Sequence, residues 1–222
     1  MKKKPLIILG AGNSTIEIID QINDINKKNS NEIEIVGILD DNKKLLNKKI
    51  LNTPIIGIIK DYKKFKKEYF FLGMFSYKNR FKRSALIKSF KNNIKKFLTI
   101  VHPSSIVGSK AKIGYGCLIS NNCNISSSSN IGNFCNISPN VSIAPKAIIK
   151  NNCFLGNSTI ATHKSIIEQN TYLGIRSIVL ENIKVMEGSR ILPNTMVHKN
   201  FNKKKGIIFG GPSRLIGFEK TK

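Results

Sequence analysis

Residues 130–149 read NIGNFCNISPNVSIAPKAII, and an isoleucine stands at every sixth position of Ile131–Ile149. The same spacing holds over Val107–Val197, where only Ala161 among the sixteen positions of the row is small rather than bulky and aliphatic. Neither an α-helix nor a two-sided strand produces a period of six. A fixed short period over so long a stretch is typical of a parallel β-helix, so this row predicts the fold of about half the chain.

A second row, two residues before the first, is small or β-branched almost throughout. It contains all four cysteines, which are Cys117, Cys123, Cys135 and Cys153. Residues two apart on a strand share a face, so we expect each short strand to turn one small and one large side chain inward. The cysteines are therefore expected to pack in the core. Thiols without a disulfide pattern fit a reducing compartment, and we expect a cytoplasmic protein.

The chain carries 37 Lys and Arg against 13 Asp and Glu, a formal net charge of +24. Such a charge is compatible with nucleic acid or a phosphorylated ligand as partner. However, the excess is lysine spread along the chain and accompanied by abundant Asn and Ile, as a coding bias produces, and no nucleic-acid-binding motif is present. We therefore expect no nucleic-acid partner. No apolar run has transmembrane length and no secretory signal is evident, so we expect no membrane insertion.

The first 41 residues have the pattern of a βαβ unit. An apolar strand over 6–9 leads into Gly10-Ala11-Gly12, a helical pattern follows over 15–25, and a second strand over 33–39 ends in Asp40-Asp41. Glycines at such a turn let a ligand approach the backbone, the helix N-terminus favours an anion, and an acidic residue after the second strand accepts hydrogen bonds from ribose or base.

The third glycine of the usual dinucleotide fingerprint is replaced by Thr15. This departure weakens the case for a dinucleotide such as NAD and leaves room for a single nucleotide. A purely structural turn stays open as an alternative.

The rest of the N-terminal part predicts a small α/β domain with a parallel sheet. We expect helices near 61–68 and 79–92, and strands over 69–75 and 97–101. His102-Pro103 then opens the β-helix. We divide the chain into a small Rossmann-like nucleotide-binding domain over 1–101, the β-helix over 102–199 and a C-terminal tail over 200–222.

Taken together, these residues resemble the bacterial sugar-nucleotide acetyltransferases that modify UDP-4-amino sugars, perosamine and sialic acid. The resemblance covers essentially the whole chain and is carried by Gly10-Ala11-Gly12, Asp40-Asp41, residues 54–57, His102-Pro103, the six-residue repeats and the closing stretch 210–214. It implies a left-handed β-helix of the trimeric acyltransferase type, a homotrimer with active sites between neighbouring β-helices, and acetyl-CoA as co-substrate without a metal.

The resemblance also implies where the ligands bind. The sugar nucleotide is expected at Gly10, Gly12, Asp40, Asp41 and Gly57. Acetyl-CoA is expected along the C-terminal coils that contain Gly174, Ile175 and Pro193, where backbone amides meet the pantetheine arm. The run Lys203-Lys204-Lys205 either pairs with phosphates of the coenzyme or is a solvated loop.

The family's catalytic histidine does not align simply. Aligned from the start of the repeats, its position falls on Ser127-Ser128, and a second family histidine near acetyl-CoA falls on Asn136. His163, two residues after Ala161 and six repeats beyond Ser127, is the predicted base, because a neutral imidazole removes protons near neutral pH. Ser127 and Asn136 are the alternative register. We expect a structural role for His102 and a solvated side chain for His198.

The favoured function is acetyl transfer from acetyl-CoA to an amino or hydroxyl group of a nucleotide-linked sugar for surface glycan synthesis. One alternative is a degenerate, non-catalytic repeat protein that binds a sugar nucleotide or a partner subunit. Another is a related transferase with a longer acyl donor. A zinc carbonic anhydrase is disfavoured, since His163 and His198 are not separated by a whole number of repeats and no close histidine pair exists.

Overall fold

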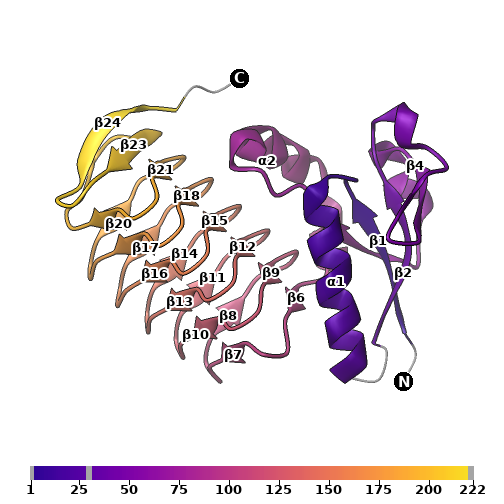
Figure 1. Ribbon diagram of the computed structural model, residues 1–222, viewed down its shortest axis with the longest axis horizontal. Helices are drawn as coiled ribbons and strands as arrows, with labels where there is room; N and C mark the ends of the chain where they lie inside the picture. Colours follow the sequence, from indigo (N-terminus) through magenta and orange to yellow (C-terminus); the bar gives the residue numbers. More distant parts are fainter. Residues whose placement is uncertain (1–2, 29–31, 220–222) are drawn as a thin grey trace.

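The computed structural model describes residues 3–28 and 32–219. Figure 1 shows two parts along the long axis, a small α/β domain at one end and a regular coil of short strands at the other. Helix α1 and helix α2 lie between the N-terminal sheet and the coil. The two parts therefore meet along the helices rather than at a flexible linker.

The N-terminal domain is a five-stranded sheet with the order β3-β4-β2-β1-β5, in which only the β3–β4 pair is antiparallel. Its elements are β1 (Lys4–Leu9), α1 (Asn13–Lys28), β2 (Ile33–Leu39), η1 (Lys43–Leu45), β3 (Lys49–Ile50), β4 (Thr53–Gly57), η2 (Ile59–Lys64), β5 (Tyr69–Leu72), η3 (Tyr77–Asn79), α2 (Arg80–Ser89) and η4 (Lys91–Lys96).

Alternation along β1 gives this sheet two packed faces. Leu6 and Ile8 join the apolar side of α1 in one buried cluster, whereas Ile7 and Leu9 face a second cluster rich in phenylalanine. Because both faces are covered, β1 is apolar throughout its buried part, as a central parallel strand requires. The expected order of strand, glycine turn, helix and strand is confirmed.

The coil consists of two-residue strands that pair in parallel with the strand 18 residues away. The strands are β6 (Ile100–Val101), β7 (Ile106–Val107), β8 (Lys112–Ile113), β9 (Leu118–Ile119), β10 (Asn124–Ile125), β11 (Asn130–Ile131), β12 (Asn136–Ile137), β13 (Ser142–Ile143), β14 (Ile148–Ile149), β15 (Phe154–Leu155), β16 (Ile160–Ala161), β17 (Ile166–Ile167), β18 (Tyr172–Leu173), β19 (Ile178–Val179), β20 (Lys184–Val185), β21 (Arg190–Ile191) and β22 (Met196–Val197).

Three sheets form the three sides of this coil. Ile137 pairs with Ile119 on one side and Leu155 on the other, so residues 18 apart stack directly. From Ile119 to Val197 every member of the repeat row is buried in a single core cluster, which confirms a parallel β-helix. Each buried aliphatic side chain contributes about 1.5–3 kcal/mol.

A third row, not used in the sequence argument, fixes the corners. Every sixth residue from Gly116 to Asn194 has a positive φ, and Gly or Asn occupies eight of these fourteen positions. Asn and Gly adopt this left-handed conformation at the lowest cost. The residues with positive φ at the corners therefore repeat with the same period of six as the inward aliphatic residues. Both patterns specify the same register of the coil.

The four cysteines are free and buried, as expected. Burial raises the pKa of the Cys117, Cys123 and Cys135 thiols above its usual value. Thiols held in this state are poor nucleophiles, so they serve the core rather than chemistry.

The structure differs from the sequence expectation at both ends of the coil. In the stretch 97–101, where one strand was expected, Phe97 forms an isolated parallel bridge with Phe70 of β5. Only Ile100–Val101 forms a strand, and it pairs with β9 of the coil. Val107 is 39% exposed because β7 ends its sheet and no further strand pairs with it. In the tail, β23 (Gly206–Phe209) and β24 (Arg214–Phe218) extend the sheet beyond β21.

Two further elements end earlier in the structure than the sequence predicts. The expected helix over 61–68 is the 3-10 helix η2 over 59–64, and the expected strand over 69–75 ends at Leu72. The Gly73 N–H donates to the Leu9 carbonyl at 2.9 Å, and a Cβ on Gly73 would lie 3.0 Å from Cγ2 of Ile8 and 3.3 Å from Oγ1 of Thr15. Among the described residues, no helix has the length and apolar character needed to cross a membrane.

Replacing Ile137 with aspartate tests the core. Ile137→Asp puts a carboxylate at a fully buried position, so we expect a loss of about 4 kcal/mol or more of unfolding free energy. Urea unfolding followed by circular dichroism measures it. The control Asn124→Asp changes an exposed residue of β10 and should stay within about 0.5 kcal/mol of the parent. A fully folded Ile137→Asp protein of unchanged stability would contradict the stacked core.

Candidate functional site

A cavity of about 470 Å³ opens where β1 and β2 end, and we call it the glycine-loop cavity. It is lined by Gly10, Ala11, Gly12, Asn13, Ser14, Asp40, Asp41, Ile59, Gly73, Met74, Phe75, Ser76 and Asn79. Carboxyl ends of parallel strands are the usual place for a ligand in such a sheet. Four of the five residues expected to hold a sugar nucleotide, namely Gly10, Gly12, Asp40 and Asp41, meet in this cavity.

The two loop glycines have different physical reasons to be glycine. Gly10 has φ +109°, and a Cβ there would lie 2.9 Å from Cγ of Met74. A Cβ on Gly12 would meet no atom within 4 Å. Gly10 is therefore required by the fold, whereas Gly12 leaves open space on the wall of the cavity.

Thr15, at the position of the missing third glycine, is fully buried. Its hydroxyl donates to the Gly10 carbonyl at 2.7 Å, and its N–H donates to the Gly12 carbonyl at 2.9 Å. Thr15 thus links the first turn of α1 to the glycine loop by hydrogen bonds. The substitution preserves the shape of the turn.

Asp40 and Asp41 brace the backbone around the cavity. Asp40 Oδ2 accepts the Ala11 N–H at 2.7 Å and Oδ1 accepts the Asn42 N–H at 2.7 Å. Asp41 Oδ1 accepts the Ile59 N–H at 3.0 Å. Asp40 therefore fixes the glycine loop, and Asp41 retains Oδ2 for a further donor.

Gly57 does not line the cavity, although it was expected with the other four. Its carbonyl accepts the Asp40 N–H at 2.9 Å. A Cβ on Gly57 would lie 2.7 Å from Oδ2 of Asp61, whose carboxyl has a pKa lowered by hydrogen bonds from Lys64 and the Ile58 N–H. Gly57 thus holds the backbone of Asp40 in place without reaching the cavity.

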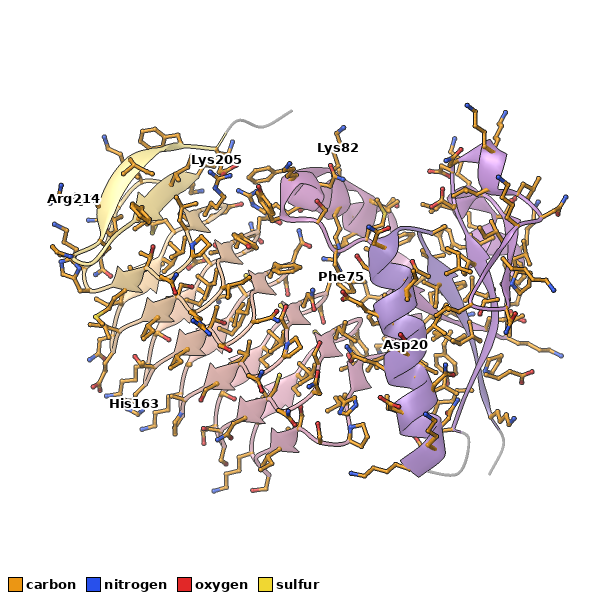
Figure 2. All side chains as sticks on the ribbon, viewed as in Figure 1. Asp20, Phe75, Lys82, His163, Lys205 and Arg214 are labelled. Atoms are coloured by element: carbon orange, nitrogen blue, oxygen red, sulfur yellow. The ribbon has the colours of Figure 1, made fainter. Side chains whose placement is uncertain are left out.

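A second cavity of about 460 Å³ lies between α1 and the coil, and we call it the α1–coil cavity. Its lining residues are Asn13, Ser14, Glu17, Asp20, Gln21, Phe75, Leu118, Ser120, Asn121, Asn136, Ser138, Pro139, Phe154 and Asn157. It shares Asn13, Ser14 and Phe75 with the glycine-loop cavity, so the two adjoin. Figure 2 shows Asp20 on α1 and Phe75 on the side of α1 that faces the coil.

Asn136 is brought to this second cavity. It is the outward residue of β12 and is only 7% exposed, and its Oδ1 accepts no hydrogen bond from the described residues. Gln21 on α1 donates through Nε2 to the Ser120 hydroxyl at 3.1 Å, and its Oε1 is likewise unpaired. Both unpaired amide oxygens are themselves buried, so these two residues line the cavity through other atoms.

Helix α2 is anchored to the coil by two buried arginines that the sequence reading missed. Arg83 Nη1 donates to the Phe134 carbonyl at 2.8 Å and to Oδ1 of Asn152, and its guanidinium lies 5.1 Å from the centre of the Phe75 ring. Burial lowers the pKa of Arg83 to about 10, so it stays charged at neutral pH.

Arg80 reaches further along the coil. Its Nε and Nη2 donate to the Asn170 and Gly188 carbonyls at 3.0 Å, and Nη2 lies 3.3 Å from Glu219. Burial lowers the pKa of Arg80, while Glu219 raises it. The first 99 residues contain 20 lysines but only these two arginines. This contrast in the sequence could have indicated that Arg80 and Arg83 have a special role. Arg is preferred where a buried cation must bond several carbonyls at once.

We call the coil side formed by β6, β9, β12, β15, β18 and β21 the docking face, because α1 and α2 pack on it. The opposite corner, formed by turns such as 126–129 and 162–165, is the distal edge. His163 and Ser127 both lie on the distal edge, and Figure 2 shows His163 away from α1. Within one chain, neither residue lines either of the two cavities, and neither lies near Asn136.

The two other histidines have local partners. Nε2 of His102 lies 3.6 Å from Asp24, and its Nδ1 accepts the Ser104 N–H. His198 Nδ1 accepts the Ser213 N–H at 3.2 Å, which joins the tail to the last coil. Neither lines the cavities described above.

The three residues expected near acetyl-CoA come together on another edge. Gly174, Ile175 and Pro193 occupy successive turns of the corner that also contributes Ser138 and Asn157 to the α1–coil cavity. A Cβ on Gly174 would lie 2.6 Å from the Pro193 nitrogen, and Ile175 is 48% exposed. Within the described part of the chain, no group of three or more His, Cys, Asp or Glu is placed to hold a metal.

The sequence analysis also did not predict the cavity walls that α1 and the segment after β5 provide. Met74, Phe75, Ser76 and Asn79 follow β5, and Glu17 and Asp20 lie on α1. The helical period of α1 marks Glu17 and Asp20 as outward, but it does not tell which outward residues meet the coil.

A scan against models of protein families gives no match, and neither does a search of curated protein sequences. Solved structures do match. A variant of perosamine N-acetyltransferase from Caulobacter crescentus, in complex with CoA and GDP-perosamine, has a TM-score of 0.82 at 15% identity over 96% of this chain and 97% of that chain.

Two further structures agree with it. The acetyltransferase domain of PglB from Neisseria gonorrhoeae, in complex with acetyl coenzyme A, has a TM-score of 0.83 at 12% identity over 97% of this chain and 100% of that one. WeeI from Acinetobacter baumannii has a TM-score of 0.80 at 14% identity over 96% and 100%. The resemblance expected from the sequence is thus confirmed at the level of the fold, along both parts of the chain.

The role of Arg83 is tested by removing its charge. Arg83→Met leaves the Phe134 carbonyl and the Asn152 amide without their donor, so we expect a loss of about 1–3 kcal/mol in urea unfolding. Lys82→Met, on the same helix, is the control because Lys82 is exposed. Equal stability of the two variants would contradict the anchoring of α2 by Arg83.

Proposed function

We propose that this chain transfers an acetyl group from acetyl-CoA to an amino or hydroxyl group of a nucleotide-linked sugar, in the synthesis of a surface glycan. One observation carries the proposal. A cavity built on a glycine loop adjoins a second cavity on a β-helix, in a fold shared over its whole length with acetyltransferases bound to CoA and GDP-perosamine or to acetyl coenzyme A.

The nucleotide occupies the glycine-loop cavity. The N-terminus of α1, at Asn13 and Ser14, favours the diphosphate, since backbone N–H groups and the helix dipole attract anions. Gly12 gives the phosphates room, and the free oxygen of Asp41 accepts a ribose or base donor. Asp40, supported by Gly57, keeps the loop in place.

Acetyl-CoA lies along the edge that carries Gly174, Ile175 and Pro193, which leads into the α1–coil cavity. The acceptor nitrogen or oxygen attacks the thioester carbonyl carbon, the C–S bond breaks, and the CoA thiolate leaves. The acceptor's proton passes to a base. Because His163 lies on the distal edge, it serves as that base only when a second copy brings it to the cavity, which agrees with a left-handed coil assembled as a homotrimer.

A non-catalytic binder is the second candidate, and one observation favours it. The alternative positions for the base hold Ser127 and Asn136, and no histidine lines either cavity. A cytoplasmic location fits the four free cysteines, since unpaired thiols are typical of reducing compartments.

Release of thiol from acetyl-CoA tests the activity. The purified protein is given UDP-, GDP-, dTDP- and CMP-linked amino and hydroxyl sugars. We expect turnover with at least one acceptor, and a loss of about 100-fold or more in His163→Ala, because general bases contribute that much. His198→Ala is the matched histidine control.

The outcomes of this assay distinguish the catalytic from the non-catalytic candidate. Turnover that survives His163→Ala places the base elsewhere, with Ser127 and Asn136 tested next. Nucleotide binding without any turnover supports the non-catalytic candidate, and the absence of both contradicts the proposal.

Gly12→Ala tests the place of the nucleotide. A methyl group here meets open space in the free protein, so we expect an unchanged melting temperature. It occupies the space proposed for the phosphates, so we expect nucleotide affinity, measured by calorimetry, to fall about tenfold or more. Gly217→Ala is the control, since its Cβ would make only an ordinary 3.6 Å contact on β24. Equal affinity in both variants would remove the nucleotide from this loop.

A further inference from the structure

A third cavity, of about 230 Å³, lies beside the phenylalanine-rich cluster of the N-terminal domain, and we call it the lysine cavity. It is built by η2, by the segment between η2 and β5, by β5 and by η4. Its lining residues are Tyr62, Lys63, Phe65, Lys66, Phe70, Asn93 and Lys96. None of them lines the glycine-loop cavity or the α1–coil cavity, so the lysine cavity is separate from both.

Three ammonium groups surround this space without a counter-ion. Lys63 and Lys66 come from one segment, and Lys96 comes from another. Within the described ranges, no carboxylate oxygen lies within 4.0 Å of the Nζ atom of any of the three. Because like charges around one cavity repel each other, an anion bound between them is favoured.

The acidic residues of the same segment do not neutralise this charge. Residues 60–68 contain five lysines, and their only acids are Asp61 and Glu68. Asp61 lies 2.6 Å from Lys64 and accepts the Ile58 N–H, and Glu68 accepts the Lys67 N–H. Neither carboxylate lines the cavity. The positive charge of the lining is thus left for a ligand.

A second and independent observation is that the walls are held in place by the fold. The Lys96 ammonium donates to the Lys66 carbonyl at 2.5 Å, a bond that joins two segments 30 residues apart. An ammonium group has three N–H donors, so this bond leaves donors of Lys96 for a ligand. Tyr62 is 6% exposed and packs edge-on against Phe70 and Phe90, with ring centres 5.6 Å and 5.0 Å apart.

The number of charges and the apolar wall together indicate the ligand. A phosphate monoester carries about −1.5 to −2 charges near neutral pH and has three acceptor oxygens, which suit three ammonium groups. A carboxylate has a single charge and two oxygens. Tyr62, Phe65 and Phe70 add an aromatic wall that an inorganic ion leaves unused. The volume is below the usual range of about 300–1,000 Å³, so only a small organic group is enclosed.

We propose that the lysine cavity binds the phosphate monoester of an apolar or aromatic alcohol, at a site distinct from those of the sugar nucleotide and acetyl-CoA. Lys63, Lys66 and Lys96 hold the phosphate, and the aromatic side chains pack against the organic group. This inference is independent of the proposed function, because both ligands of that function bind elsewhere.

Phenyl phosphate is the probe, and inorganic phosphate and benzoate are the comparison ligands. Each is titrated by calorimetry into the full chain without nucleotide or coenzyme. We expect phenyl phosphate to bind about tenfold more tightly than either comparison ligand. In Lys63→Gln/Lys96→Gln its affinity should fall about tenfold or more, because two of the three charges are lost.

Lys49→Gln/Lys112→Gln is the matched control, since it removes the same charge from two exposed lysines outside the cavity and should change the affinity by less than about twofold. Melting temperatures report folding. If Lys63→Gln/Lys96→Gln melts early, Lys63→Gln/Lys66→Gln replaces it, because both side chains are exposed and the Lys96 bond is kept.

Three results overturn the inference. Equal affinity for the three ligands excludes a site for a monoester, and an equal loss in the control variant indicates general attraction to the charge of the protein. A loss in Gly12→Ala, with none in the lysine variants, places the phosphate at the glycine loop instead.

Vesicles of phosphatidylcholine, with and without phosphatidic acid, identify the source of the monoester. Co-sedimentation that requires both phosphatidic acid and the two lysines assigns it to a lipid headgroup. Binding of phenyl phosphate without co-sedimentation assigns it to a free compound.

Discussion

The row of inward aliphatic side chains is the constraint on which the rest of the structure depends. Each member stacks on residues 18 positions away, so the whole row shares one register. A shift of one residue would turn every inward side chain outward, because the side-chain period of a strand is two. This register fixes which residues form the corners and which form the outward faces. The positions of Asn136 and His163 relative to the N-terminal domain follow from it.

The second determinant is the attachment of the N-terminal domain to one coil face. Most basic residues of this chain are lysines, but α2 uses Arg80 and Arg83 to bond carbonyls of the coil. Taking a guanidinium out of water is costly unless its donors are used. Arg80 bonds through all three of its nitrogens, whereas Arg83 bonds through Nη1 and leaves Nε and Nη2 without an acceptor among the described residues. Together these bonds define one docking position for α2. The glycine-loop and α1–coil cavities exist because α1 and the segment after β5 are held at that position.

The sequence predicts the coil well because its signal repeats sixteen times, and the glycine loop because its residues are contiguous. It does not tell which coil face receives the N-terminal domain, since all three faces share the inward pattern. Gly57 illustrates the limit: it was grouped with the cavity residues, but its carbonyl supports Asp40 from behind. Glu17 and Asp20 were passed over because an outward helical residue is normally solvated. Only the docking of α1 on the coil gives them a cavity to line.

The geometry also links the identity of the base to assembly. A three-sided coil places its distal edge opposite its docking face, and the packed interior leaves no route between them. A mechanism that uses His163 therefore requires at least two copies. A mechanism confined to one chain has four titratable side chains along the described walls of the glycine-loop and α1–coil cavities: Glu17, Asp20, Asp40 and Asp41. Asp40 is occupied in bracing the loop, so the carboxylates of α1 and Asp41 are what a single chain offers, and dependence of turnover on assembly distinguishes the two mechanisms.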